Sequence, residues 1–281
     1  MLSPSQTPPA SGRFKPGPRP GASLRRPRGE TKGRAAAGLS LKPMTGRLEA
    51  GFRHRFRDLL ALVRPKRLEF GVDLLMGRGR DLAAREGLPL ARGLARTYEL
   101  TRRRVVKRVE VTGACSLVHP PWARFEETSP PRFLCDPSLG GLARWLRAAG
   151  YEARDAAGRE ALGDAARDPG LVLLTSDAEL LDRRLAREAR GLVLWIPSAL
   201  TMREQLSIVL RDLGLRPRDA RCMACGGTLV PARKQDVGPR IPPRTALWKD
   251  DYYVCAGCDR LFWQGTHWER IAGTLAAAAG P

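Results

Sequence analysis

Long apolar stretches are missing from this chain of 281 residues, and cysteine is scarce, with six in all. No stretch approaches the roughly 20 consecutive apolar residues that a membrane-spanning helix needs, so no membrane association is expected. The chain also opens without the apolar segment of a secretory signal. Both shortages argue against a disulfide-stabilised secreted domain, and free thiols suit a reducing compartment. We therefore expect a cytoplasmic protein.

Acidic residues are the next shortage, and it is confined to the front half of the chain. Residues 1–130 carry 27 Lys and Arg against 11 Asp and Glu, whereas residues 131–281 carry 22 against 18. A net charge of +20 with this distribution favours a polyanionic partner, of which nucleic acid is the commonest, and we expect RNA. The alternative is a compositional drift toward Arg, Ala, Gly and Pro that serves no partner.

Aliphatic clusters are absent from residues 1–45, which are rich in Pro, Gly, Ser and Arg. Such a segment cannot bury enough apolar surface to offset its ordering entropy, so we expect a disordered basic tail. Residues 46–128 are expected to form a small basic domain whose fold the pattern specifies poorly. Its apolar spacing predicts a short helix around residues 56–62 and a weak strand over residues 104–111.

Two CxxC motifs are the most specific feature that the chain does contain. They are Cys222–Cys225 and Cys255–Cys258, with 29 residues between them. Two thiolates in one tight turn can bind a metal ion from adjacent directions, and two such turns complete the tetrahedron of a structural zinc ion. Neighbouring glycines suit the backbone of these turns. The pattern predicts a zinc ribbon over residues 216–281, in preference to two disulfides.

Residues 131–215 alternate between strand and helix patterns. The continuous apolar run at residues 171–174 is typical of a parallel strand that helices cover on both faces. Alternation of this kind predicts a parallel sheet with right-handed crossovers. The expected strands cover residues 132–135, 151–154, 171–174 and 192–196, and the expected helices cover residues 137–150, 160–167, 178–189 and 202–213.

Two acidic residues directly follow predicted strands. Asp136 follows the first strand and Asp177 the third, and ligands of open α/β sheets bind at this edge. Crowded carboxylates there favour Mg²⁺ or Mn²⁺, which prefer oxygen ligands, and Glu160 is the best third acid. The competing interpretation is that each Asp only caps a helix. Thr175 and Ser176 are candidates to orient a carboxylate, and the spare acids are Asp155, Asp164, Glu179 and Asp182.

Two further groups have both a functional and a structural interpretation. Arg144 and Arg147 lie three residues apart on one predicted helix, so they share a face that would grip a phosphodiester or simply be solvated. Aromatic residues of the tail would stack on unpaired bases or, in the interpretation that we favour, pack the small core of a ribbon. These tail residues are Tyr252, Tyr253, Phe262, Trp263 and Trp268, with His267 among them.

The segment Phe133–Tyr151, which reads FLCDPSLGGLARWLRAAGY, resembles the opening of the Mut-seven C-terminal ribonuclease family. Further family landmarks follow in order at Leu173–Asp177, Glu204–Leu206, Arg221–Cys225 and Phe262–Trp268, so the similarity covers roughly residues 131–275. The resemblance implies a PIN-like fold with a zinc ribbon and metal-dependent ribonuclease chemistry. It also implies that Asp136, Glu160 and Asp177 correspond to the acids of PIN-type sites.

The sequence therefore predicts an α/β protein, with a PIN-like parallel sheet carrying helices on both faces, followed by a four-cysteine zinc ribbon. We expect a divalent-metal-dependent ribonuclease in which Asp136, Glu160 and Asp177 hold Mg²⁺ or Mn²⁺ while Arg144 and Arg147 position RNA. One alternative is a non-catalytic RNA-binding or ribosome-associated zinc-ribbon module. The other is an aspartyl phosphotransferase. This alternative is disfavoured because the chain has no acid two residues after Asp136.

Overall fold

The structure is a computed structural model that describes residues 44–112, 120–156 and 158–279. The expected basic tail lies outside the described residues except for its last two positions, which begin a helix at Met44. Cys115 also lies outside them. Within the described ranges, no helix is long and apolar enough to cross a membrane.

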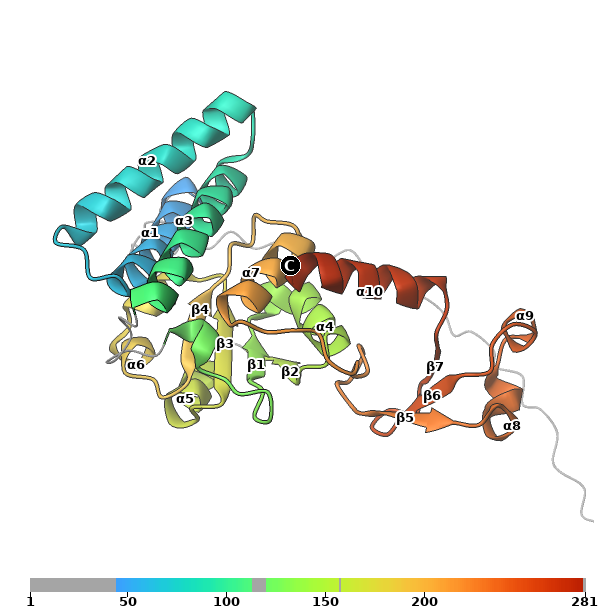
Figure 1. The fold of residues 1–281 in the computed structure, drawn as a ribbon. Helices are drawn as coiled ribbons and strands as arrows, with labels where there is room; N and C mark the ends of the chain where they lie inside the picture. Colours follow the sequence, from blue (N-terminus) through green and yellow to red (C-terminus); the bar gives the residue numbers. More distant parts are fainter. Residues whose placement is uncertain (1–43, 113–119, 157, 280–281) are drawn as a thin grey trace, which may run out of the picture. The chain divides into compact units, whose positions relative to one another are not determined.

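Residues 44–112 form three α-helices, α1 (Met44–Ala61), α2 (Leu68–Glu86) and α3 (Leu90–Thr112) (Figure 1). The short helix expected around residues 56–62 is the end of α1. The strand expected over residues 104–111 is wrong, because these residues form the last turns of α3. The buried residues there are Val105 and Val109, which lie one helical turn apart.

The three helices share one apolar core with part of the sheet. Phe52 and Phe56 of α1 are fully buried, and the rings of Phe52 and Trp195 pack edge to face with their centroids 5.3 Å apart. A Cβ atom on Gly51 would lie 2.2 Å from that indole, so only glycine allows α1 to approach so closely. The core of the three helices therefore extends onto Trp195 of the sheet.

The central sheet has four parallel strands, β1 (Arg132–Cys135), β2 (Ala153–Asp155), β3 (Leu171–Thr175) and β4 (Leu192–Trp195). Their order is β2-β1-β3-β4, and every neighbouring pair is parallel (Figure 1). The expected parallel sheet is confirmed.

Helices cover both faces of this sheet, as expected. Phe133 and Cys135 of β1 point into a core with α4 (Gly140–Ala148) and α7 (Met202–Asp212). Leu134 points the other way, into a core with α5 (Gly158–Arg167). The alternation follows from the two-residue period of a strand. Because both faces are apolar, β1 and β3 read as continuous hydrophobic runs.

The helix expected over residues 178–189 is broken in two. A 3₁₀ helix, η3 (Ala178–Asp182), is followed by the short α6 (Arg184–Arg187), and Arg183 between them has an extended backbone. Leu180 packs in the core beneath α5, whereas its neighbour Leu181 packs against the core of α1–α3. The segment serves two separate cores, which the apolar spacing alone did not show.

The ribbon is an antiparallel sheet of β5 (Leu229–Ala232), β6 (Tyr252–Cys255) and β7 (Leu261–Trp263) in the order β5-β6-β7. Three short helical turns connect β5 to β6, namely α8 (Lys234–Val237), η4 (Gly238–Arg240) and α9 (Pro243–Ala246). Helix α10 (Thr266–Ala279) follows β7. Its buried residues Leu275 and Ala278 belong to the sheet core beside α7, so the end of the expected ribbon range packs with the α/β unit.

Candidate active site and metal centre

The carboxyl ends of three strands bring polar residues to one edge of the sheet. Cys135, the last residue of β1, pairs with Asp155 of β2 and with Leu174 of β3. Asp136 and Thr175 each come one residue later on their own strands. Parallel pairing therefore brings Asp136, Asp155 and Thr175 to the same edge of the sheet, where α/β proteins bind ligands.

Hydroxyl groups hold the Asp136 carboxylate in place. Its Oδ1 accepts hydrogen bonds from the backbone N–H and the hydroxyl of Ser138, both at 3.0 Å, and its Oδ2 accepts one from the Thr175 hydroxyl at 3.3 Å. The Thr175 oxygen in turn accepts the backbone N–H of Asp177 at 3.0 Å. Thr175 thus links the two acids that the sequence places at this edge.

Both acids also act as helix caps. Asp136 caps the 3₁₀ turn Pro137–Leu139, and Asp177 Oδ1 accepts the backbone N–H of Glu179 at 2.9 Å to cap η3. The capping interpretation is therefore correct as far as it goes. A cap uses only part of a carboxylate, and Asp177 Oδ2 makes no hydrogen bond to any described residue. Capping fixes the orientation of each acid and leaves lone pairs for a cation.

Asp155 joins this edge, although the sequence ranked it only as a spare acid. It is exposed, and its Oδ1 lies 3.8 Å from the position of a Cβ atom on Gly140, at the start of α4. Burial raises the pKa of the nearby Cys135 thiol to about 12, and the Asp155 and Asp136 carboxylates add to that rise. The available signal was that Asp155 ends the second strand, where Asp136 follows the first.

Glu160 is exposed in the first turn of α5, the helix that follows β2. Among the described residues, the four cysteines are the only group of three or more possible ligands whose atoms lie within 4.8 Å of one another. Asp136, Glu160 and Asp177 are not gathered that closely. The spare acids Asp164 and Asp182 make ion pairs elsewhere, with Arg154 and Arg167 and with His54.

A tryptophan closes the edge on the β4 side. The indole N–H of Trp195 donates to the Ser176 carbonyl at 3.0 Å, and the Ser176 hydroxyl lies 2.7 Å from that of Ser138. Trp195 is packed against Phe52 of α1. The helical region thereby supports the loop that presents Asp177.

The two arginines of α4 do not share an environment, contrary to the expectation of a common face. Arg144 is exposed, whereas Arg147 is buried and donates to backbone carbonyls of Ala153, Met223 and Ala224. The placement leaves Arg144 available to a bound phosphodiester. For Arg147 it supports a structural role and does not support the expected contact with RNA.

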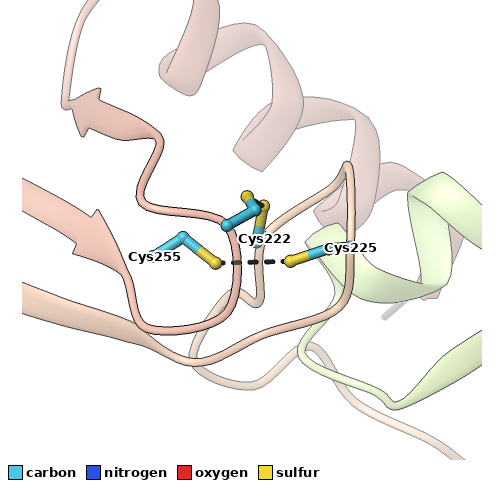
Figure 2. Close-up of side chains that lie close together, drawn as sticks. Cys222, Cys225 and Cys255 are labelled. Atoms are coloured by element: carbon cyan, nitrogen blue, oxygen red, sulfur yellow. Dashed lines mark hydrogen bonds between the residues drawn. The ribbon is translucent and has the colours of Figure 1, made fainter.

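The four cysteines converge as the CxxC spacing predicts. Figure 2 shows three of them, Cys222, Cys225 and Cys255, with their sulfurs close together. The sulfurs of Cys222 and Cys258 are 3.6 Å apart, and those of Cys225 and Cys255 are 3.4 Å apart. A disulfide needs about 2.05 Å. Four sulfurs on a tetrahedron with Zn–S bonds of about 2.3 Å are separated by about 3.8 Å. The cluster is positioned to bind one metal ion and is compatible with a zinc ribbon.

Backbone N–H groups prepare these sulfurs to be thiolates. Gly227 donates to Cys225 Sγ and Gly257 to Cys255 Sγ, each at 3.3 Å. Burial opposes ionisation of Cys255, but N–H groups of Cys258 and Gly257, together with the thiols of Cys225 and Cys258, lower the pKa of Cys255 to about 7. A backbone N–H lowers the pKa of Cys258, but burial and the neighbouring thiols outweigh it and raise that pKa to about 12, so the first thiolate of the cluster forms at Cys255. Metal-binding cysteines must be deprotonated, so the donor set fits a thiophilic cation such as zinc.

The aromatic residues of the tail divide between a core and a cavity. Tyr252 is buried in the small ribbon core with Val237 and Ile241, which is the packing role that we favoured for it. Phe262, Trp263 and Trp268 are partly exposed. They line a cavity of about 730 Å³ between the ribbon and α10, together with His267, Arg218 and Arg221.

Comparison with known proteins agrees with the resemblance read from the sequence. The family model of the Mut7-C RNAse domain matches residues 131–275, just over half of the chain, from the start of the sheet into α10. No curated protein and no solved structure matches the chain. The match includes the acidic edge and all four clustered cysteines. The chain belongs to the Mut7-C RNAse domain family.

Proposed function

We propose that this protein is a divalent-metal-dependent ribonuclease that hydrolyses phosphodiester bonds of RNA. The observation that carries the proposal is the convergence of Asp136, Asp155 and the Asp177 loop at the carboxyl edge of a parallel sheet. Family membership supports a nuclease-type activity. Neighbouring carboxylates at such an edge repel one another, and a hard divalent cation relieves that repulsion.

Asp136 and Asp177 would hold Mg²⁺ or Mn²⁺, with Glu160 as the third acid and Asp155 as an addition from the structure. When bound, the cation lowers the pKa of a water and offsets negative charge on the attacked phosphate. Ser138 and Thr175 hold the Asp136 carboxylate in one orientation, so the carboxylate need not rotate during the reaction.

RNA would approach along the exposed side of α4. This helix begins four residues after Asp136, and Arg144 on its exposed face would contact the phosphate backbone. The cavity beside the ribbon offers Trp263 and Trp268 for stacking on an unpaired base, with Arg218 and Arg221 at its wall. The four cysteines would hold a structural zinc ion that stabilises this wall.

The decisive experiment incubates the full chain with labelled single- and double-stranded RNA in Mn²⁺, Mg²⁺ or EDTA. Cleavage that requires the cation and stops in EDTA is the expected result. Tight RNA binding without cleavage in either cation would favour the non-catalytic binding module instead. The phosphotransferase alternative gains no support, because Ser138 occupies the position two residues after Asp136. A location in the cytoplasm stays a prediction.

A further inference from the structure

Arg147 is a buried cation without a carboxylate partner among the described residues. It lies in the last turn of α4 with 7% of its surface exposed, between the fully buried Leu146 and the buried Ala148. Removing a guanidinium from water is costly unless its donors are satisfied. The contacts that compensate for this burial therefore reveal what the side chain does.

All of its hydrogen bonds go to backbone carbonyls of two separate segments. Nε donates to Ala153 of β2 at 2.6 Å. Nη1 donates to Met223 at 3.2 Å and to Ala224 at 3.0 Å. The backbone adds a further link, since the Arg221 N–H donates to the Arg147 carbonyl at 2.9 Å.

Both segments are functionally placed. Met223 and Ala224 are the two residues between Cys222 and Cys225, so the metal-binding turn fixes the directions of their carbonyls. Ala153 is the first residue of β2, and Asp155, two residues later, ends this strand at the acidic edge. One planar guanidinium therefore joins the metal-binding turn to the strand that presents an acid, and the planar group holds this geometry more rigidly than an ammonium would.

We propose that Arg147 is a positioning residue that couples metal binding at the four cysteines to the acidic edge of the sheet. The ribbon is then a structural part of the nuclease site and not an independent attachment. The effect of this coupling on RNA cleavage rests on the proposed function, whereas the coupling between the cysteine cluster and β2 is independent of it. Coupling between two sites is reciprocal. Zinc loss therefore loosens β2, and loosening β2 weakens zinc retention. Because Arg147 is the link, its removal weakens zinc retention as well.

The test combines the full-length Arg147→Lys and Arg147→Met variants with zinc removal. Zinc transfer to a chromophoric chelator should be about tenfold faster in Arg147→Met, since this variant has no charged donor to hydrogen-bond the metal-binding turn. Arg147→Lys keeps the charge but loses the planar guanidinium, so its rate of zinc transfer should lie between those of the wild type and Arg147→Met. The control is Arg184→Lys. Arg184 is exposed, pairs only with Glu188 in the part of the chain that the structure describes, and should tolerate this change without effect.

Amide hydrogen exchange at residues 153–155 supplies a readout that needs no activity. In the wild type, chelating zinc should speed exchange there, whereas in Arg147→Met exchange should already be fast and chelation should add little. With Mn²⁺ varied, the Arg147 variants should need more Mn²⁺ for half-maximal cleavage, with an unchanged KM for RNA.

Zinc release at the wild-type rate, or additive effects of chelation and Arg147→Met on β2, would overturn the coupling. Arg147→Lys serves the same test if Arg147→Met fails to fold, as judged by circular dichroism. A wild-type protein that cleaves no RNA would refute the proposed function while the zinc-release and exchange results still decide the coupling.

Discussion

At the scale of single residues, Asp136 shows how one carboxylate can serve structure and chemistry together. Its Oδ1 caps a 3₁₀ turn and its Oδ2 accepts from Thr175 of the neighbouring strand. Asparagine caps a helix about as well as aspartate does, but it brings no charge to a cation. The two roles therefore separate on substitution.

We predict that Asp136→Asn lowers RNA cleavage at saturating Mn²⁺ on the order of a thousandfold, because a charged metal ligand contributes several kcal/mol to the transition state. Its melting temperature should change by only a few degrees. Cleavage assays and thermal melts of the same preparations check both parts.

Asp168→Asn is the matched control for that substitution. Asp168 also accepts a backbone N–H two residues ahead, from Gly170 at 2.8 Å, but it precedes β3 and so lies at the opposite edge of the sheet. It should retain full activity. If Asp136→Asn is fully active as well, the nuclease proposal fails and the binding module takes its place.

At the scale of elements, the ribbon has very little apolar core of its own. Val237, Ile241 and Tyr252 are its buried cluster, and β5–β7 are three or four residues long. A domain of this size usually needs a metal or disulfides to fold. We therefore expect its four cysteines to carry much of its stability through a bound zinc ion.

We predict one zinc ion per chain, measured by elemental analysis, and its loss in Cys222→Ser. Chelation should unfold β5–β7 while the far larger sheet core persists, because metal binding and ribbon folding are linked. Thiol labelling should then become fast at all four cysteines. A purified protein that contains no zinc, or whose four thiols react freely before chelation, would contradict this.

A buried ion pair joins helices α1 and α7. Arg55 donates to Asp212 at 2.5 Å, with both side chains less than a tenth exposed, and the Tyr98 hydroxyl and Arg102 approach the same carboxylate. Arg55 also lies over the Tyr98 ring, 4.2 Å from its centroid. Breaking one partner of such a pair leaves an uncompensated buried charge.

Asp212→Leu should therefore lower the free energy of unfolding by about 3–5 kcal/mol. The double variant Arg55→Met/Asp212→Leu should recover a large part of that loss, because no unpaired guanidinium remains buried. Denaturant unfolding of the two single variants and the double variant measures the coupling. Strictly additive losses would show that the pair contributes nothing specific to the contact between α1 and α7.

At the scale of the whole molecule, the basic front half consists of two different regions. Residues 44–112 are helices whose core includes Trp195 of the sheet. Deleting residues 1–128 would therefore expose the apolar surface around Trp195, and a change in RNA binding would not be separable from a change in folding. Residues 1–43 carry nine Lys and Arg and one Glu. Removing only this segment is the cleaner test of its charge.

We predict that deleting residues 1–43 leaves the melting temperature unchanged and flattens the salt dependence of RNA binding. Each phosphate that the shortened protein no longer neutralises should reduce the log–log slope by about 0.7 for single-stranded RNA, because fewer counterions are released. Binding isotherms over a range of salt concentrations give the slope. An identical slope in both proteins would mean that the basic segment is compositional drift.

Local chemistry by itself determined much of this protein. The apolar runs at β1 and β3 predict the strands, and Leu142, Ala143 and Leu146 of α4 recur at helical spacing, because strand and helix periods are recorded in nearby residues. The CxxC spacing predicts the cysteine cluster for the same reason, since two residues between thiols define one turn. Asp136 and Asp177 are predicted as metal ligands because the ends of parallel strands meet at one edge, and their role stays a prediction.

Contacts between distant residues decided the rest. Arg144 and Arg147 look alike in the sequence, yet only the packing of the ribbon on α4 buries Arg147 against carbonyls 76 and 77 positions away. Asp155 joined the acidic edge through its pairing with β1, and residues 104–111 became helix because α3 buries Val105 and Val109. Spacing records which residues share a face, but only the tertiary structure determines what that face meets.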